Sequence, residues 1–116
     1  MYRTRTITID IDYSKSDRYI DISIYRFLYI CKSKDVEKCS MCLTENGIHL
    51  YIVLKKDIGY WDMIMLRSIL LDDNNRIDFD MDREVYPQVM FKDKYVVRDT
   101  YRKKISFERI CYFLNR

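Results

Sequence analysis

Several residue types are scarce in this chain of 116 residues, which has no alanine, one proline, two glycines and one histidine. A single histidine excludes the His-x-His metal site of nicking enzymes, although 11 tyrosines are present. Two isolated glycines cannot form the glycine-rich loop that cradles phosphates. Apolar runs such as 48–54 are far shorter than the roughly 20 residues of a membrane span, and no signal-peptide pattern is present. We therefore expect no membrane partner.

The length and composition are typical of one globular domain. A chain of 116 residues is too short for two independent cores, yet long enough to bury a two-layer core. Its hydrophobic content of 48%, with 15% aromatic residues, excludes a disordered chain. We expect a single domain that covers residues 1–116.

Charge is distributed unevenly along the chain, whose net charge is +3. Residues 92–116 contain eight basic and three acidic residues, whereas residues 1–91 contain 13 basic and 15 acidic ones. A basic C-terminal extension beside a weakly acidic body suits a polyanion or an acidic protein as partner. The alternative is a solvated surface with uneven charges. The candidate contacts in this extension are Arg98, Arg102, Lys103 and Lys104.

The first half of the chain predicts a strand, a helix and a hairpin. Polar and apolar residues alternate over 6–12, which indicates a strand with one buried face. Apolar residues then recur at helical spacing over 20–31, after N-cap chemistry at 14–17. Two further strands over 36–45 and 48–54 flank Asn46-Gly47, a strong hairpin signal since both residues tolerate positive φ.

The second half predicts a helix over 60–71 capped by Asp57, and a fourth strand over 76–80. Short extended pieces are expected within 88–97. A closing helix begins after Ser106, with Phe107, Ile110, Cys111 and Leu114 on one side. The resulting β-α-β-β-α-β order predicts an α+β, ferredoxin-like or RRM-like two-layer sandwich, with both helices on one sheet face and the other face open.

Several side chains are expected to converge on that open face, because the first and third strands are central neighbours in such a sheet. Carboxylates spaced i, i+2 on one strand and facing a third from another strand suit Mg²⁺ or Mn²⁺. A nearby imidazole can hold a phosphate, and an exposed tyrosine can stack on bases. The alternative is that these aspartates are solvated or paired with Arg5 or Arg76. The set comprises Asp10, Asp12 and Asp78 as metal ligands, His49, and Tyr51.

Three of these segments resemble motifs of the archaeo-eukaryotic primase superfamily, whose RRM-like core carries an hhhDhD strand, a small-residue-x-His strand and an hhD strand. They are Ile7-Thr8-Ile9-Asp10-Ile11-Asp12, Gly47-Ile48-His49-Leu50 and Arg76-Ile77-Asp78. The resemblance covers about residues 6–81. It implies Asp10, Asp12 and Asp78 as metal ligands and His49 as a catalytic nucleotide-phosphate contact. Active enzymes of that superfamily carry a further αβ unit, for which 116 residues leave no room.

A second resemblance is to small orphan proteins of archaeal filamentous and rod-shaped viruses. It rests on Gly47-Ile48-His49 and on a pattern L-R-x-x-L-x-D-D-x-x-R-x-x-x-D over residues 66–80, and Leu71 stands where many of those proteins have glycine. The absence of alanine and the abundance of tyrosine also look like the codon bias of such viruses. Members of that group include an anti-CRISPR inhibitor of a type III effector complex, which implies action in the cytoplasm of the host cell.

The four cysteines do not indicate a metal site. Cys39 and Cys42 form one CxxC, and on a strand residues three apart point to opposite faces. Zinc needs four ligands, and Cys31 and Cys111 lie on other elements. We expect buried or free thiols, with a disulfide as the alternative that hyperthermophile proteins form inside cells.

Two functions follow from these patterns. The preferred one is a viral interaction protein, not an enzyme, that docks on a host nucleoprotein complex or RNA, most concretely as an anti-CRISPR inhibitor of a type III effector. A plain nucleic-acid-binding RRM-like module is a further alternative. The alternative is a metal-dependent nucleotidyltransferase or nuclease-like enzyme that uses Mg²⁺ or Mn²⁺. No other cofactor is expected, and a homodimer stays open.

Overall fold

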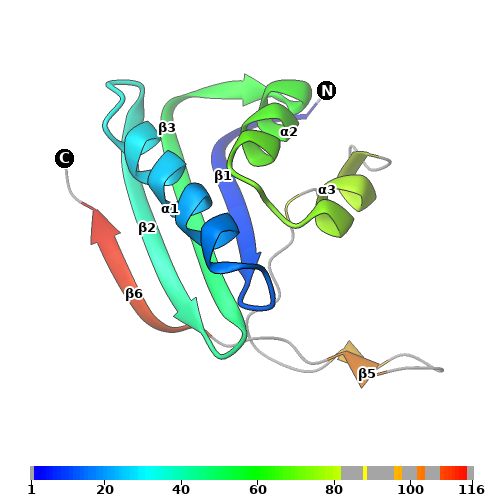
Figure 1. The fold of residues 1–116 in the computed structure, drawn as a ribbon. Coiled ribbons are helices and arrows are strands. Elements are labelled where there is room, and N and C mark those ends of the chain that lie inside the picture. Colours follow the sequence, from blue (N-terminus) through cyan, green and yellow to red (C-terminus); the bar gives the residue numbers. More distant parts are fainter. Residues whose placement is uncertain (1, 82–87, 89–95, 98–101, 104–107, 115–116) are drawn as a thin grey trace.

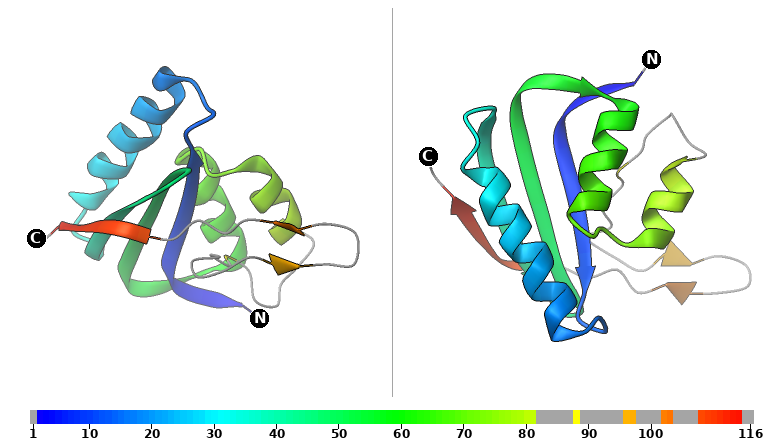
Figure 2. Two further views of the ribbon diagram at one scale, coloured as in Figure 1. Left: turned by 90° about the horizontal axis from the view of Figure 1, so that it is seen from below. Right: turned by 45° about the horizontal axis from the view of Figure 1, so that its top comes forward.

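The computed structural model describes residues 2–81, 88, 96–97, 102–103 and 108–114. Its main body is an antiparallel sheet of four strands in the order β1-β3-β2-β6, with helices α1 and α2 on one face (Figures 1 and 2). The elements are β1 (Arg3–Asp12), α1 (Asp17–Cys31), β2 (Val36–Thr44), β3 (Gly47–Gly59), α2 (Tyr60–Ile69), α3 (Asn74–Met81), β4 (Val96–Val97), β5 (Arg102–Lys103) and β6 (Glu108–Leu114). The α+β class with a two-layer arrangement agrees with the prediction.

The first strand and the hairpin are confirmed. Ile7, Ile9 and Ile11 are at most 1% exposed, so the alternation of β1 buries its isoleucine face as predicted. β3 lies between β1 and β2 and is antiparallel to both. The β1-β3-β2 part of the expected order is therefore present.

The helix predicted over 20–31 is confirmed as α1, which begins one turn earlier. The Ser16 hydroxyl accepts a hydrogen bond from the Tyr19 amide at 3.2 Å and caps the helix, as the N-cap chemistry indicated. The predicted cap of the next helix is wrong, because Gly59 is the N-cap of α2 and Asp57 instead forms an ion pair with Arg3 at 2.8 Å. Within the described segments no helix has the length and apolar character needed to cross a membrane.

The fourth strand expected over 76–80 is wrong, because these residues belong to helix α3. The Asp73 carboxylate accepts the Asn75 amide at 2.8 Å, and its carbonyl accepts the Ile77 amide at 3.0 Å, which starts the helix. Ile77 and Asp80 are buried at helical spacing, whereas Phe79, which alternation would have buried, is 59% exposed. No described strand flanks β1 on its outer side, so the full ferredoxin-like order is absent there.

The closing helix is also wrong, since Glu108–Leu114 forms strand β6 and pairs with β2. Leu114 packs against the core while Phe113, its neighbour, points to the other face. The start of that predicted helix, Ser106 and Phe107, lies outside the described residues. Of the extended pieces expected within 88–97, only Gln88 and β4 are described, and β4 pairs with β5.

All four cysteines form disulfides, so the expectation of thiols is wrong. Cys39 bonds Cys31 of α1 on the core side of the sheet, and Cys42 bonds Cys111 of β6. The prediction that Cys39 and Cys42 point to opposite faces is confirmed. Strand β2 is therefore linked covalently to the helical layer and to the edge strand.

Gly47 closes the hairpin where expected, but not through a positive φ. A Cβ atom at this position would lie 1.9 Å from the carbonyl oxygen of Ile11. Glycine is required here because β1 passes too close for any side chain.

Candidate functional site

Asp10 and His49 are direct neighbours on the sheet face opposite the helices, as the strand alternation predicted. They are register partners across β1 and β3, and the Asp10 Oδ1 atom lies 3.6 Å from the His49 Nε2 atom. The His49 ring meets the Tyr51 ring edge to face at 6.5 Å between centroids. Two of the predicted site residues and the predicted stacking tyrosine are thus brought together.

The centre of this face is not open, which corrects the expectation of a bare surface. His49 is 3% exposed, its register partner Cys42 on β2 is 4% exposed, and Thr8, the partner of Tyr51 on β1, is 7% exposed. Burial raises the pKa of the Asp10 carboxyl above its ordinary value of 3.8, although the neighbouring His49 and Arg76 side chains act in the opposite direction. Of the two arginines expected as alternatives, Arg76 acts on Asp10, whereas Arg5 pairs with Glu37.

The other two predicted metal ligands do not join Asp10. Asp12 lies at the exposed end of β1, where its carboxylate accepts the Ser14 amide at 2.7 Å. Asp78 is exposed on α3, because that segment is a helix. Over residues 2–81, 88 and the described strands beyond, no three His, Cys, Asp or Glu side chains are grouped as for a metal ion.

The basic residues predicted as partner contacts are only partly described. Arg102 and Lys103 form strand β5. Arg98 and Lys104 lie outside the described residues. Their proposed role therefore rests on the charge of the sequence.

Residues of the L-R-x-x-L-x-D-D pattern seal the outer edge of β1. The Asp72 carboxylate accepts the Asp10 amide at 2.8 Å, and Arg76 donates to the Thr8 carbonyl at 2.9 Å. The Gln88 side chain accepts the Thr8 amide at 2.8 Å and donates to the Thr6 carbonyl at 2.7 Å. Side chains thus take the place of the missing fourth strand, because backbone groups at a buried edge need partners.

Arg67 lies at the centre of a buried ionic network. It is 0% exposed, and its guanidinium contacts the carboxylates of Asp72 at 2.7 Å and Asp80 at 2.6 Å. Arg76 contacts the same Asp72 oxygen at 2.7 Å. Burial raises the pKa of the Asp72 carboxyl, and the two guanidinium groups counteract that rise. The charged residues Arg67, Asp72, Arg76 and Asp80 are therefore occupied in holding α2 and α3 to β1.

Leu71 explains why a glycine suits this position in the pattern. Its φ is 61°, and its amide donates to the Ser68 carbonyl while the Asp72 amide donates to the Arg67 carbonyl. This is the Schellman ending of a helix, in which the left-handed residue is usually glycine. The turn aims the Asp72 carboxylate at the edge of β1.

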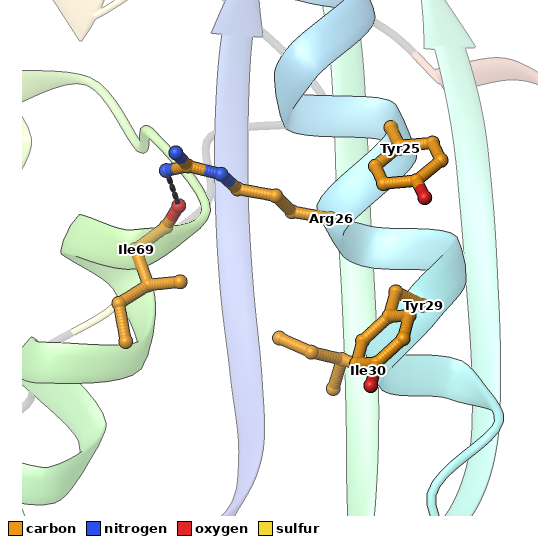
Figure 3. A pocket seen from close by; sticks show the side chains of 5 residues that line it. All are labelled: Tyr25, Arg26, Tyr29, Ile30 and Ile69. Carbon is orange, nitrogen blue, oxygen red and sulfur yellow. Dashed lines mark hydrogen bonds between the residues drawn. The ribbon is translucent and has the colours of Figure 1, made fainter.

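A groove of about 410 Å³ lies between α1 and α2 and is lined by Tyr25, Arg26, Tyr29, Ile30 and Ile69 (Figure 3). The Arg26 guanidinium spans it and donates to the Ile69 carbonyl at 2.8 Å. Tyr25 and Tyr29 follow one another along α1 and are 73% and 71% exposed. The groove thus combines an apolar floor with exposed aromatic rings, as protein-binding surfaces do.

This groove was not predicted, although the sequence carries a signal for it. Tyr25 and Tyr29 are four residues apart and lie off the apolar stripe of the predicted helix. Two aromatic rings on the solvent side of a helix stack on one face and are not required by the core. Their partner Ile69 could not be placed beside them without the packing of α2.

No protein-family model, no curated protein and no solved structure matches this chain.

Proposed function

We propose that this chain is an interaction protein that docks on a host nucleoprotein complex. The resemblance to viral orphan proteins supports a narrower form of the proposal, in which the complex is a type III CRISPR effector and docking inhibits it. The groove between α1 and α2 contacts a protein subunit of that complex, and the basic extension contacts its RNA.

The exposure of Tyr25 and Tyr29 carries this proposal. Each ring leaves more than two-thirds of its surface in water, which costs free energy unless a partner covers it. Tyrosine and arginine dominate binding hot spots, and here Arg26 lies between the two rings in the sequence. Trp61 of α2, 59% exposed, adds a third aromatic side chain to the helical layer.

The charge of residues 92–116 supports the nucleic-acid part. Eight basic residues there face three acidic ones, whereas the rest of the chain is weakly acidic. Such an asymmetry steers the extension toward phosphates and makes the association sensitive to salt. Lys103 and Lys104 lie at its centre.

The test is binding of the purified chain to a purified type III effector complex, followed by surface plasmon resonance. The double variant Tyr25→Ala, Tyr29→Ala should weaken binding by at least about 30-fold, since a single hot-spot ring already contributes about 2 kcal/mol. Tyr13→Ala is the matched control, because Tyr13 is 47% exposed and lies in the turn after β1. It should leave binding unchanged. Circular dichroism checks that each variant is folded.

The charge part is tested with Lys103→Glu, Lys104→Glu, which should weaken binding and reduce its salt dependence. Full binding by the tyrosine variant would refute docking through the groove. Equal affinity for RNA alone and for the complex would favour the plain nucleic-acid-binding module instead.

The Asp10–His49 pair favours a second candidate, a metal-dependent enzyme that acts on nucleotides. A carboxylate with a raised pKa beside a buried imidazole is an arrangement that acid–base chemistry uses. Mn²⁺ should then raise the melting temperature of the wild type but not that of Asp10→Asn. An equal response of both proteins, or none, would refute this candidate.

A further inference from the structure

The two edges of the sheet differ in how they are finished. The outer groups of β1, from the Thr6 carbonyl to the Asp10 carbonyl, are bonded by Gln88, Arg76, Asp72 and Asp73. At the opposite edge, no described strand pairs with the outer side of β6. An open edge strand is a template for pairing with another strand.

The register shows which backbone groups of β6 point outward. The Cα atoms of Cys42 and Cys111 are 4.0 Å apart, a separation typical of a cross-strand pair that does not exchange hydrogen bonds. The amide and carbonyl of Cys111 therefore point away from β2. The same holds for Phe113, since this direction alternates along a strand, whereas Arg109 lies at the register irregularity and has no register partner on β2.

The side chains of β6 do not protect this edge. Ile110, Tyr112 and Phe113 are 53%, 50% and 73% exposed, and residues 110–114 include no charged residue and no proline. Natural edge strands usually carry lysine, proline or a bulge to prevent pairing. The register irregularity between β2 and β6 lies near Thr44, before residues 110–114 of β6. β6 also lies outside the part of the sheet that α1 covers (Figures 1 and 2).

We propose that β6 pairs antiparallel with β6 of a second copy of this chain, around a two-fold axis at Cys111, and forms a continuous sheet across the dimer. Cys111 is the midpoint of Glu108–Leu114, so this register overlaps the whole strand. The outward amide and carbonyl of Cys111 would bond those of Cys111 in the other copy, and the outward groups of Phe113 would extend the ladder. Ile110 faces Tyr112 of the other copy.

The second copy fits this edge better than an arbitrary strand does. In the two-fold register the only charged residues, Glu108 and Arg109, face Leu114 and Phe113 of the other copy, so no like charges are opposed. Pairing at the edge covers only part of these three side chains, so with the backbone ladder the contact stays below the roughly 1,000 Å² of a specific interface. A contact of that size predicts a weak dimer that forms at micromolar concentrations and above.

The first test is the mass of the full chain by analytical ultracentrifugation from about 1 to about 300 µM, a range that brackets such an affinity. We expect a monomer–dimer equilibrium. Tyr112→Lys should shift its midpoint at least 10-fold higher, because it places two charges at the seam. Tyr13→Lys is the control and should leave it unchanged, since Tyr13 lies in the turn after β1 and is 47% exposed. Failure of the docking proposal would show as full binding by the Tyr25→Ala, Tyr29→Ala variant and would leave this equilibrium as it is.

Amide hydrogen exchange of the wild-type chain provides the second test and needs no variant to fold. The amides of Cys111 and Phe113 should become protected as the concentration rises, whereas those of Ile110 and Tyr112, which point to β2, should be protected throughout. A chain that stays monomeric at the highest concentration would overturn the proposal. So would a dimer in which the Cys111 and Phe113 amides exchange at the monomer rate.

Discussion

Asp72 is the residue on which the attachment of α2 and α3 to the sheet depends most. Its carboxylate accepts four hydrogen bonds, from the side chains of Arg67 and Arg76 and from the amides of Asp10 and Asp73. The substitution Asp72→Asn keeps the shape but turns one acceptor oxygen into an NH₂ donor. That donor faces either the guanidinium groups or the backbone amides, so two of the four contacts are lost.

The expected cost follows from the burial of the network. Arg67 and Asp72 are both 0% exposed, and removal of the Asp72 charge leaves Asp80 as the remaining carboxylate that contacts Arg67. Breaking a buried ion pair by removing one partner costs about 3–5 kcal/mol. For a chain of this size we expect the melting temperature to fall by roughly 10–20 °C.

Urea denaturation followed by circular dichroism measures this free energy directly. Asp78→Asn is the matched control, because Asp78 is an exposed aspartate of the same segment, and it should change stability by less than about 0.5 kcal/mol. A loss below about 1 kcal/mol for Asp72→Asn would show that the network does not hold the helices to β1.

Three further outcomes are expected. The pKa of Asp10 is raised above 3.8 in the folded state, so the stability of the wild type falls as pH rises through that pKa. Asp10→Asn should therefore be more stable than the wild type at about pH 7. Melting curves below pH 3.8 should show no such gain. Loss of the Cys42–Cys111 disulfide, which spans 69 residues, should lower the free energy of unfolding by about 4 kcal/mol. Loss of Cys31–Cys39, which spans 8 residues, should lower it by about 2.5 kcal/mol. Equal losses for the two double Cys→Ser variants in urea denaturation would contradict this. Leu71→Gly should raise the melting temperature by a few degrees, because φ of 61° costs leucine about 1 kcal/mol; a clear decrease would mean that packing of the Leu71 side chain outweighs that strain.

The first strand and the hairpin could be predicted because their local signals agree with their tertiary roles. Strict alternation over 6–12 leaves only one face for the isoleucines, and Asn46-Gly47 fixes where the chain reverses. The neighbourhood of Asp10 and His49 then follows from the strand order alone. Even so, the physical reason for Gly47 was missed, since the close approach of Ile11 is a contact between distant segments.

The segment 74–81 could not be predicted from its own pattern. Ile77 and Phe79 alternate as in a strand, yet Ile77 and Asp80 also fit one face of a helix. The choice is made by Asp72 and Arg76, whose side chains already satisfy the backbone of β1. Once that edge has partners, a further strand beside it gains no hydrogen bonds.

The C-terminal segment was misassigned for a similar reason. Ile110, Cys111 and Leu114 fit a helical stripe, and Tyr112 and Phe113 fit a strand equally well. The deciding contact is the disulfide between Cys111 and Cys42, and connectivity among four cysteines cannot be deduced from sequence.

The ionic network also bears on what the shared L-R-x-x-L-x-D-D-x-x-R-x-x-x-D pattern means. Its charged positions Arg67, Asp72, Arg76 and Asp80 are all occupied by contacts with one another or with β1. A pattern of this kind specifies how a sheet edge is closed by side chains. Proteins that carry it should therefore share the sealed edge. The proposed contacts of this chain, the tyrosines of α1 and the open strand β6, lie outside the pattern.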